Sequence, residues 1–179
     1  MRLLFNTSLP VWFIEKLDSR LECFNIVLAQ GQCADVAIWV YDSQERWTLH
    51  IIEAKETVDV SSSSRGWGHI KKQFLGALLR CRMLAGIFGI HFDQVIFYTA
   101  FVNDHITPRS KPKTEEYDTE DTTLFRVVDD TSSPWSEWQT GECHIESPDL
   151  QGNYTEQAYA HRQILLESST LESKDTVRL

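Results

Sequence analysis

Two neighbouring segments rich in β-branched and aromatic residues constrain the fold of this chain more than any other feature. The first runs over 34–41 and the second over 46–57, and the polar cluster Asp-Ser-Gln-Glu at 42–45 separates them. This pattern predicts a β-hairpin. Both segments are apolar at consecutive positions, which is typical of strands buried on both faces of a sheet. We therefore expect a sheet that is covered by helices on both sides.

The flanking residues predict the elements around this hairpin. We expect a short helix over 10–22, with Pro10 in its first turn, and then a strand over 23–30. The longest helix is predicted over 67–88, and a further strand over 94–102. Apolar positions that recur at the helical period should bury one face of the long helix: Ile70, Phe74, Leu78 and Cys81. Lys71, Lys72 and Arg82 should lie on its exposed face.

The resulting order, α-β-β-β-α-β, predicts the α/β class. With 179 residues the chain has the length of a single domain. We expect a core over 1–103, an acidic and irregular extension over 104–153, a closing helix over 154–167 and a loose tail over 168–179.

Composition narrows the environment of the protein. Apolar residues make up 42% of the chain, but none of their runs reaches the roughly 20 residues that span a membrane. The four cysteines form no Cys-x-x-Cys pair, which argues against a structural zinc site. No secretory signal is evident, so we expect free, buried thiols in the cytoplasm and no membrane partner.

The net charge of −9 is unevenly distributed. Residues 1–112 carry 12 Lys and Arg against 11 Asp and Glu, whereas residues 113–179 carry 5 against 15. Within the first part, 65–82 holds five basic residues and no acidic one. The negative net charge of the whole chain therefore does not reveal the basic patch on the long helix. Such a patch can bind nucleic acid.

The hairpin brings charged residues together at its open end. If the turn is formed by 43–45, paired positions add up to 88, which places Asp35 directly opposite Glu53. Strand alternation sends Lys55 to the same face as Glu53. Two adjacent carboxylates are what Mg²⁺ or Mn²⁺ prefers, and the carbonyl of Ala54 is a further candidate ligand. The alternative is a salt-bridge cluster on a solvated rim.

These residues resemble the PD-(D/E)xK nuclease superfamily, which has the restriction-endonuclease-like fold. The resemblance covers about 10–103 and rests on Asp35, on Glu53-Ala54-Lys55 and on the order of elements, with Ala34 where the family often has Pro. It implies an α/β/α sandwich with a central mixed sheet and a Mg²⁺- or Mn²⁺-dependent endonuclease. Asp35 and Glu53 would be metal ligands, and Lys55 would be the catalytic lysine that assists the attacking water.

The same resemblance implies auxiliary residues and a substrate. Glu15 stands where many members have an acidic residue on the first helix, and Gln73 where some have a glutamine. DNA, rather than RNA, is the expected substrate. We expect the nucleic-acid backbone to contact three basic residues near the start of the long helix: Arg65, Lys71 and Lys72. The alternative for these is a solvated helix face.

The acidic last third supports two rival functions. A non-catalytic interaction protein on the same fold would use this region to bind a basic partner protein. A nuclease-like subunit would cut only within a larger complex. Trp135 and Trp138 are the residues on which a protein partner would be expected to dock.

Overall fold

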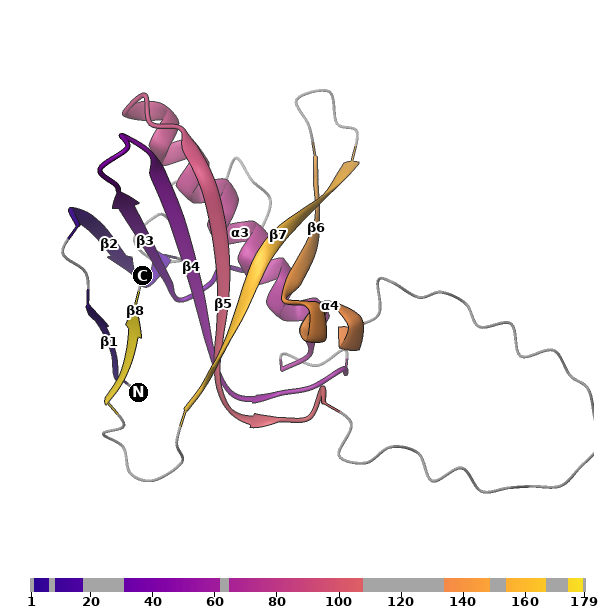
Figure 1. Cartoon of the computed structure of the whole chain (residues 1–179). Helices are drawn as coiled ribbons and strands as arrows, with labels where there is room; N and C mark the ends of the chain where they lie inside the picture. Colours follow the sequence, from indigo (N-terminus) through magenta and orange to yellow (C-terminus); the bar gives the residue numbers. More distant parts are fainter. Residues whose placement is uncertain are drawn as a thin grey trace, which may run out of the picture.

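The computed structural model describes residues 2–6, 9–17, 31–61, 65–107, 134–148, 154–166 and 174–178. They form a mixed α/β structure in which a long helix crosses one face of a sheet (Figure 1). The elements in chain order are β1 Arg2–Asn6, β2 Val11–Glu15, β3 Val36–Tyr41, β4 Trp47–Val58, α3 Trp67–Ile87, β5 Phe92–Asp104, α4 Pro134–Thr140, β6 Glu142–Pro148, β7 Tyr154–Leu165 and β8 Lys174–Arg178.

Six of the strands form one mixed sheet in the order β2-β3-β4-β5-β7-β6. The strand β3 runs antiparallel to both of its neighbours, β2 and β4, while β5 is parallel to β4 and to β7. The edge strand β6 is antiparallel to β7. The helix α3 connects the parallel strands β4 and β5, which need a crossover of this length. The predicted α/β class and the central mixed sheet are therefore confirmed.

The hairpin of β3 and β4 has the register expected from the sequence. Val36 pairs with Ile52 and Tyr41 pairs with Trp47, so paired positions add up to 88 along the whole ladder. Asp42 closes the turn by accepting hydrogen bonds from the backbone of Gln44 and Arg46, at 2.8 and 3.0 Å. Because the turn fixes the register, it also fixes which residues meet at the open end.

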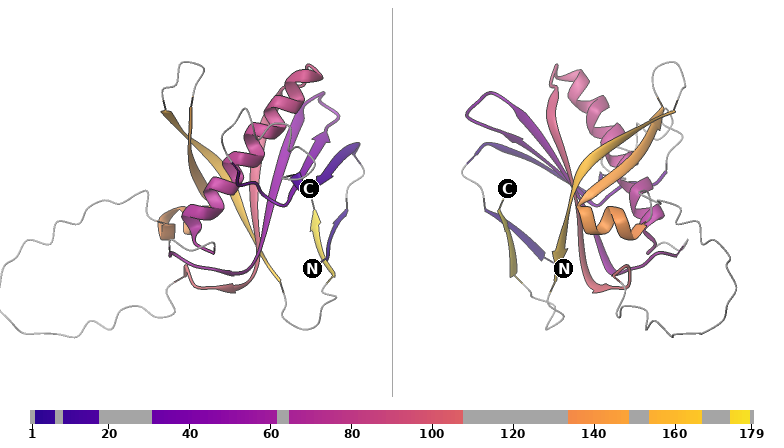
Figure 2. Two further views of the ribbon diagram at one scale, coloured as in Figure 1. Left: turned by 180° about the vertical axis from the view of Figure 1, so that it is seen from behind. Right: turned by 45° about the vertical axis from the view of Figure 1, so that its right-hand side comes forward.

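The main core lies between α3 and the sheet (Figure 2). The four helix positions expected to be buried are all fully buried, and the Phe74 ring stacks on Phe97 of β5 with centroids 4.6 Å apart. Lys72 and Arg82 are exposed as expected, but Lys71 is half-buried. The opposite face carries a smaller apolar cluster: Ile38, Val40, Ile52, Ile96 and Tyr98.

The prediction of helices on both faces is not met by the described residues, where α3 covers one face only. The helix predicted over 10–22 is wrong for its first part, because Val11–Glu15 is an edge strand paired with β3. This segment is apolar and aromatic, and such side chains favour a pleated surface. The Trp12 ring stacks on Trp39 of β3 with centroids 5.6 Å apart. The strand predicted over 23–30 lies outside the described residues.

The last third is more regular than the sequence indicates. The closing helix predicted over 154–167 is wrong, because Tyr154–Leu165 is a strand inserted between β5 and β6. The extension 104–153 contains α4 and β6 instead of being irregular throughout. Within the predicted loose tail, Lys174–Arg178 pairs in parallel with Arg2–Asn6. Backbone pairing with strands far away in sequence overrides the weak local preferences of these segments.

Other expectations concern thiols and membranes. Cys81 and Cys143 are buried free thiols, and Cys33 is a half-buried one. Cys23 lies outside the described residues. No helix in the described part of the chain is long and apolar enough to cross a membrane.

Candidate active site

The open end of the β3–β4 hairpin brings Asp35 and Glu53 together. Asp35 lies just before β3, and its Oδ2 accepts a hydrogen bond of 2.9 Å from the backbone N–H of Ala54. The Asp35 side chain thus adds a hydrogen bond between the two strands just beyond their last backbone pair, Val36 and Ile52. Asp35 is exposed, whereas Glu53 is only 1% exposed. The pair therefore consists of one buried carboxylate and one that solvent can reach.

Lys55 shares the face of Glu53, and its Nζ lies 2.6 Å from Glu53 Oε1. Burial and the like charge of Asp35 together raise the pKa of Glu53 to about 7, against the lowering effect of Lys55. Among the described residues, the other carboxylate oxygen, Glu53 Oε2, is buried and has no hydrogen-bond partner of good geometry, although the Gln73 side chain acts on this carboxylate. A buried acceptor without a partner is costly, which marks this atom as one that a ligand can satisfy.

The two auxiliary residues differ in position. Gln73 of α3 extends toward the site, where its side chain helps to lower the pKa of Glu53 and its Nε2 donates to the Cys33 carbonyl at 3.4 Å. Glu15 is an exposed residue of β2 that pairs with Val36, and Val36 faces the side of the sheet opposite Glu53. The prediction that Glu15 sits on a helix is wrong, and the sheet separates it from Glu53.

The basic residues lie in three different places. Burial lowers the pKa of His69, and the charges of Lys55 and Lys72 lower it further, so the start of α3 carries basic groups near the candidate site. Arg65 lies beyond the end of β4, where its Nε is 3.9 Å from Asp59 Oδ2. Lys71 points toward β6, where it lines a groove together with Lys72.

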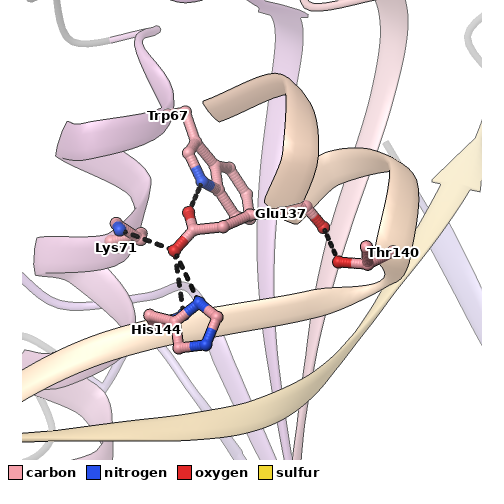
Figure 3. Close-up of polar contacts among 5 residues, drawn as sticks. All are labelled: Trp67, Lys71, Glu137, Thr140 and His144. Atoms are coloured by element: carbon pink, nitrogen blue, oxygen red, sulfur yellow. Dashed lines mark hydrogen bonds and ion pairs between the residues drawn. The ribbon is translucent and has the colours of Figure 1, made fainter. Parts of the chain in front are cut away.

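Lys71 belongs to a buried cluster around Glu137 of α4 (Figure 3). Glu137 is 1% exposed, and its Oε1 lies 3.0 Å from Lys71 Nζ and 3.2 Å from His144 Nδ1. Its Oε2 accepts a hydrogen bond from Trp67 Nε1. Beside the cluster, α3 and the β6–β7 hairpin enclose an open groove of about 460 Å³. Lys71 and Lys72 face Glu146 and Glu156 across it, so its two walls carry opposite charge.

The donor set at Asp35 and Glu53 fits a hard divalent cation. Two carboxylates supply oxygen ligands, and the orphaned Oε2 of Glu53 needs a positive partner. Within the described ranges, no three His, Cys, Asp or Glu side chains converge as a ready-made metal site. A cation here would therefore be held by these two carboxylates, with backbone oxygen or water as its remaining ligands.

The sequence pattern did not indicate several polar residues that are buried in the structure. Thr99 stands within an apolar strand, which is a weak signal, and His161 and Glu137 stand in segments whose structure was predicted incorrectly. Trp138 was considered as a docking residue, but it is buried and its Nε1 donates to Asp104 Oδ2 at 3.3 Å. These positions become meaningful only once β7 and α4 are in place.

In comparisons with protein-family models, with curated proteins and with solved structures, no match to this chain was found. A functional assignment must therefore come from the site itself.

Proposed function

We propose that this protein is a metal-dependent nuclease of the PD-(D/E)xK type, which hydrolyses phosphodiester bonds of DNA. The observation that carries the proposal is the pairing of a buried, partly unsatisfied Glu53 with Asp35, just before the neighbouring strand β3, and with Lys55 on the same face. Such a combination of burial, like charge and a strongly shifted pKa is typical of functional sites.

In this proposal Asp35 and Glu53 hold Mg²⁺ or Mn²⁺, and the carbonyl of Ala54 is a further candidate ligand. The cation supplies charge stabilisation at the phosphate and activates water. Lys55 orients the attacking water and stabilises the negative charge that develops on the phosphate. Lys55 and Lys72 both act electrostatically on His69, so in this proposal the start of α3 extends the basic surface toward the substrate.

Replacing Lys55 should abolish cleavage without abolishing folding. We expect Lys55→Ala to lower the rate of DNA cleavage by about 100-fold or more, the scale for one preorganised electrostatic group. The fold should persist because Glu53, whose pKa is already raised to about 7, can take up a proton when its partner is lost. The assay uses single-stranded, double-stranded and branched DNA, and RNA, with Mg²⁺ and with Mn²⁺.

Glu56→Gln is the matched control, because Glu56 is exposed and alternates to the opposite face of the same strand. It should cut at the wild-type rate, whereas Glu53→Gln should need more Mn²⁺. If the wild-type protein cuts none of these substrates and binds neither metal at millimolar concentration by calorimetry, the nuclease proposal is wrong.

The charge distribution favours a second candidate function. A free-standing nuclease usually presents a wide basic surface, because phosphate contacts dominate its affinity. Here residues 113–179 carry ten more acidic than basic residues (15 against 5). We therefore also propose, as the alternative, an interaction protein or a subunit of a nuclease complex that binds a basic partner through this acidic third.

A further inference from the structure

The segment 31–34, which leads directly into Asp35, is hydrogen-bonded to the helix α3. The backbone N–H of Ala34 donates to the carbonyl of Gln73 at 3.1 Å. The Gln73 side chain donates in turn from its Nε2 to the carbonyl of Cys33 at 3.4 Å. The last two residues of the segment are therefore held by the backbone and the side chain of a single helix residue.

Arg80 holds the same segment about two turns further along α3. Its guanidinium Nη1 donates to the Gln32 carbonyl at 3.3 Å and to the Gly76 carbonyl of its own helix at 2.9 Å. A guanidinium is a rigid fork of N–H donors, which suits it to bridging two carbonyls. The Arg80 side chain is fully buried, so its donors are engaged inside the protein. Gln73, Gly76 and Arg80 share one face of the helix, because they lie three and four residues apart.

Gly76 allows the segment 31–34 to lie this close to the helix. A Cβ atom at position 76 would overlap the backbone carbonyl of Gln32. A backbone carbonyl cannot rotate away as the end of a flexible side chain can, so a larger residue here must push the segment off α3. Gly86 of the same helix differs, because a Cβ there would meet no described side chain or neighbouring segment within 4 Å.

These contacts matter for Asp35 because the β-ladder fixes this residue from one direction only. The strand β3 begins after it, at Val36, and the Asp35 carbonyl accepts a hydrogen bond of 2.8 Å from the backbone N–H of Lys16. Before Asp35 the chain is not part of a strand, and backbone outside regular structure has more conformations to lose. The contacts of the segment 31–34 with α3 therefore restrict where the Asp35 carboxylate can lie.

We propose that Arg80 and Gly76 are positioning residues for Asp35. They hold the segment 31–34 against α3, and the segment keeps the Asp35 carboxylate where its Oδ2 accepts the hydrogen bond from Ala54. The helix thereby sets the separation of the two carboxylates that would bind the cation. The inference rests on the proposed function for the metal, but the coupling of Asp35 to the segment can be tested without it.

The first test measures amide hydrogen exchange without metal. The Ala34 amide donates to the Gln73 carbonyl, and the Ala54 amide donates to Asp35. If the segment and Asp35 move as one unit, both amides exchange through the same opening, and their protection factors in the wild-type protein should agree within about tenfold. A larger difference would show that Asp35 moves independently of the segment, and would overturn the proposal.

The same measurement on Gly76→Ala distinguishes a local effect from a loss of overall stability. The amides of Ala34 and Ala54 should lose protection together in this variant, while the amides inside the β3–β4 ladder keep theirs. Gly86→Ala is the matched control and should leave all of them protected. Unchanged protection of Ala54 in Gly76→Ala would contradict the coupling.

The second test measures Mn²⁺ affinity by calorimetry, on proteins that urea melts show to be folded. Residues that position metal ligands from outside the coordination sphere typically contribute 10- to 100-fold to affinity, so Gly76→Ala should weaken Mn²⁺ binding about 10-fold. Gly86→Ala should bind as the wild type does. Equal affinity of the folded Gly76→Ala and wild-type proteins would overturn the positioning role of Gly76.

Arg80 provides an independent pair of variants. Arg80→Met keeps an unbranched side chain but removes the donors, and it should weaken Mn²⁺ binding about as much as Gly76→Ala does. Arg80→Lys retains a charged donor and should restore most of the affinity. Wild-type affinity in the folded Arg80→Met protein would overturn the positioning role of Arg80.

The two tests separate failure of this inference from failure of the proposed function. If the wild-type protein binds no Mn²⁺, the nuclease proposal fails, and hydrogen exchange alone then decides whether the segment positions Asp35. If Gly76→Ala does not fold, the exchange of Ala34 and Ala54 in the wild-type protein and Mn²⁺ binding by the Arg80 variants still decide the outcome.

Discussion

At the scale of single residues, the site depends on the different burial of two charged residues, Glu53 and Lys55, on the same face of β4. Glu53 lies beneath α3 and is buried, whereas Lys55 is nearer the open end and keeps a side-chain exposure of 17%. A buried carboxylate is stable only with partners. Lys55 satisfies one oxygen, Asp35 adds a like charge, and the remaining oxygen is left for a ligand. The burial that makes the Glu53 carboxylate energetically unfavourable therefore also favours the binding of a ligand to it.

The raised pKa of Glu53 makes stability depend on pH in a defined direction. The folded protein holds this proton up to a pH of about 7, and the ordinary value is 4.5. The group thus stabilises the fold fully below pH 4.5, and the contribution is lost as the pH rises to 7. In the presence of a chelator, the unfolding free energy of the wild type relative to Glu53→Gln should fall by about 3 kcal/mol across this range.

Urea unfolding of both proteins at several pH values measures this difference. Glu56→Gln provides the baseline for an exposed glutamate of the same strand. The difference in unfolding free energy between this variant and the wild type should not change with pH. If the difference in unfolding free energy between Glu53→Gln and the wild type also does not change with pH, Glu53 is solvated. The argument for a ligand at Oε2 then fails.

At the scale of elements, the short helix α4 is held by one carboxylate. Glu137 links α4 to α3 through Trp67 and Lys71, and to the edge strand β6 through the backbone N–H of His144 at 3.1 Å. A helix of two turns is not stable on its own in water. Its position beside the sheet therefore comes from these tertiary contacts and from the burial of Trp138.

We expect Glu137→Ala to destabilise the protein by about 3 kcal/mol, because it leaves Lys71 without its ion-pair partner and the Trp67 N–H without an acceptor. Glu142→Ala removes an exposed acidic residue of β6 and should change the free energy by less than about 0.5 kcal/mol. Urea melts measure both. A loss below about 1 kcal/mol for Glu137→Ala would mean that water replaces the carboxylate in this cluster.

At the scale of the whole molecule, the acidic last third would oppose the binding of nucleic acid that we propose for the basic start of α3. A run of seven residues, 115–121, contains five acidic side chains. Changing these five to their amides moves the formal net charge from −9 to −4. If the protein binds DNA, this variant should bind several-fold more tightly at low salt, and the advantage should shrink as salt screens the charges.

Fluorescence anisotropy with a labelled duplex at several salt concentrations gives the affinity of each protein. A variant with the same five-residue change and Lys72→Gln separates the contribution of α3 from that of the total charge. Equal affinities of wild type and amide variant at low salt would show that the acidic run does not compete with DNA, and would favour a role in binding a basic protein.

The strongly patterned half of the chain could be predicted from its sequence, and the other half could not. The register of β3 and β4 follows from a short turn, and the buried face of α3 follows from its period, because both depend on contacts close in sequence. Asp35, Glu53 and Lys55 were therefore placed correctly relative to one another. The strand nature of Val11–Glu15 and Tyr154–Leu165 depends on partners far away in the chain. Only the assembled sheet could therefore place Thr99 beside Glu53, and turn Glu15 away from it.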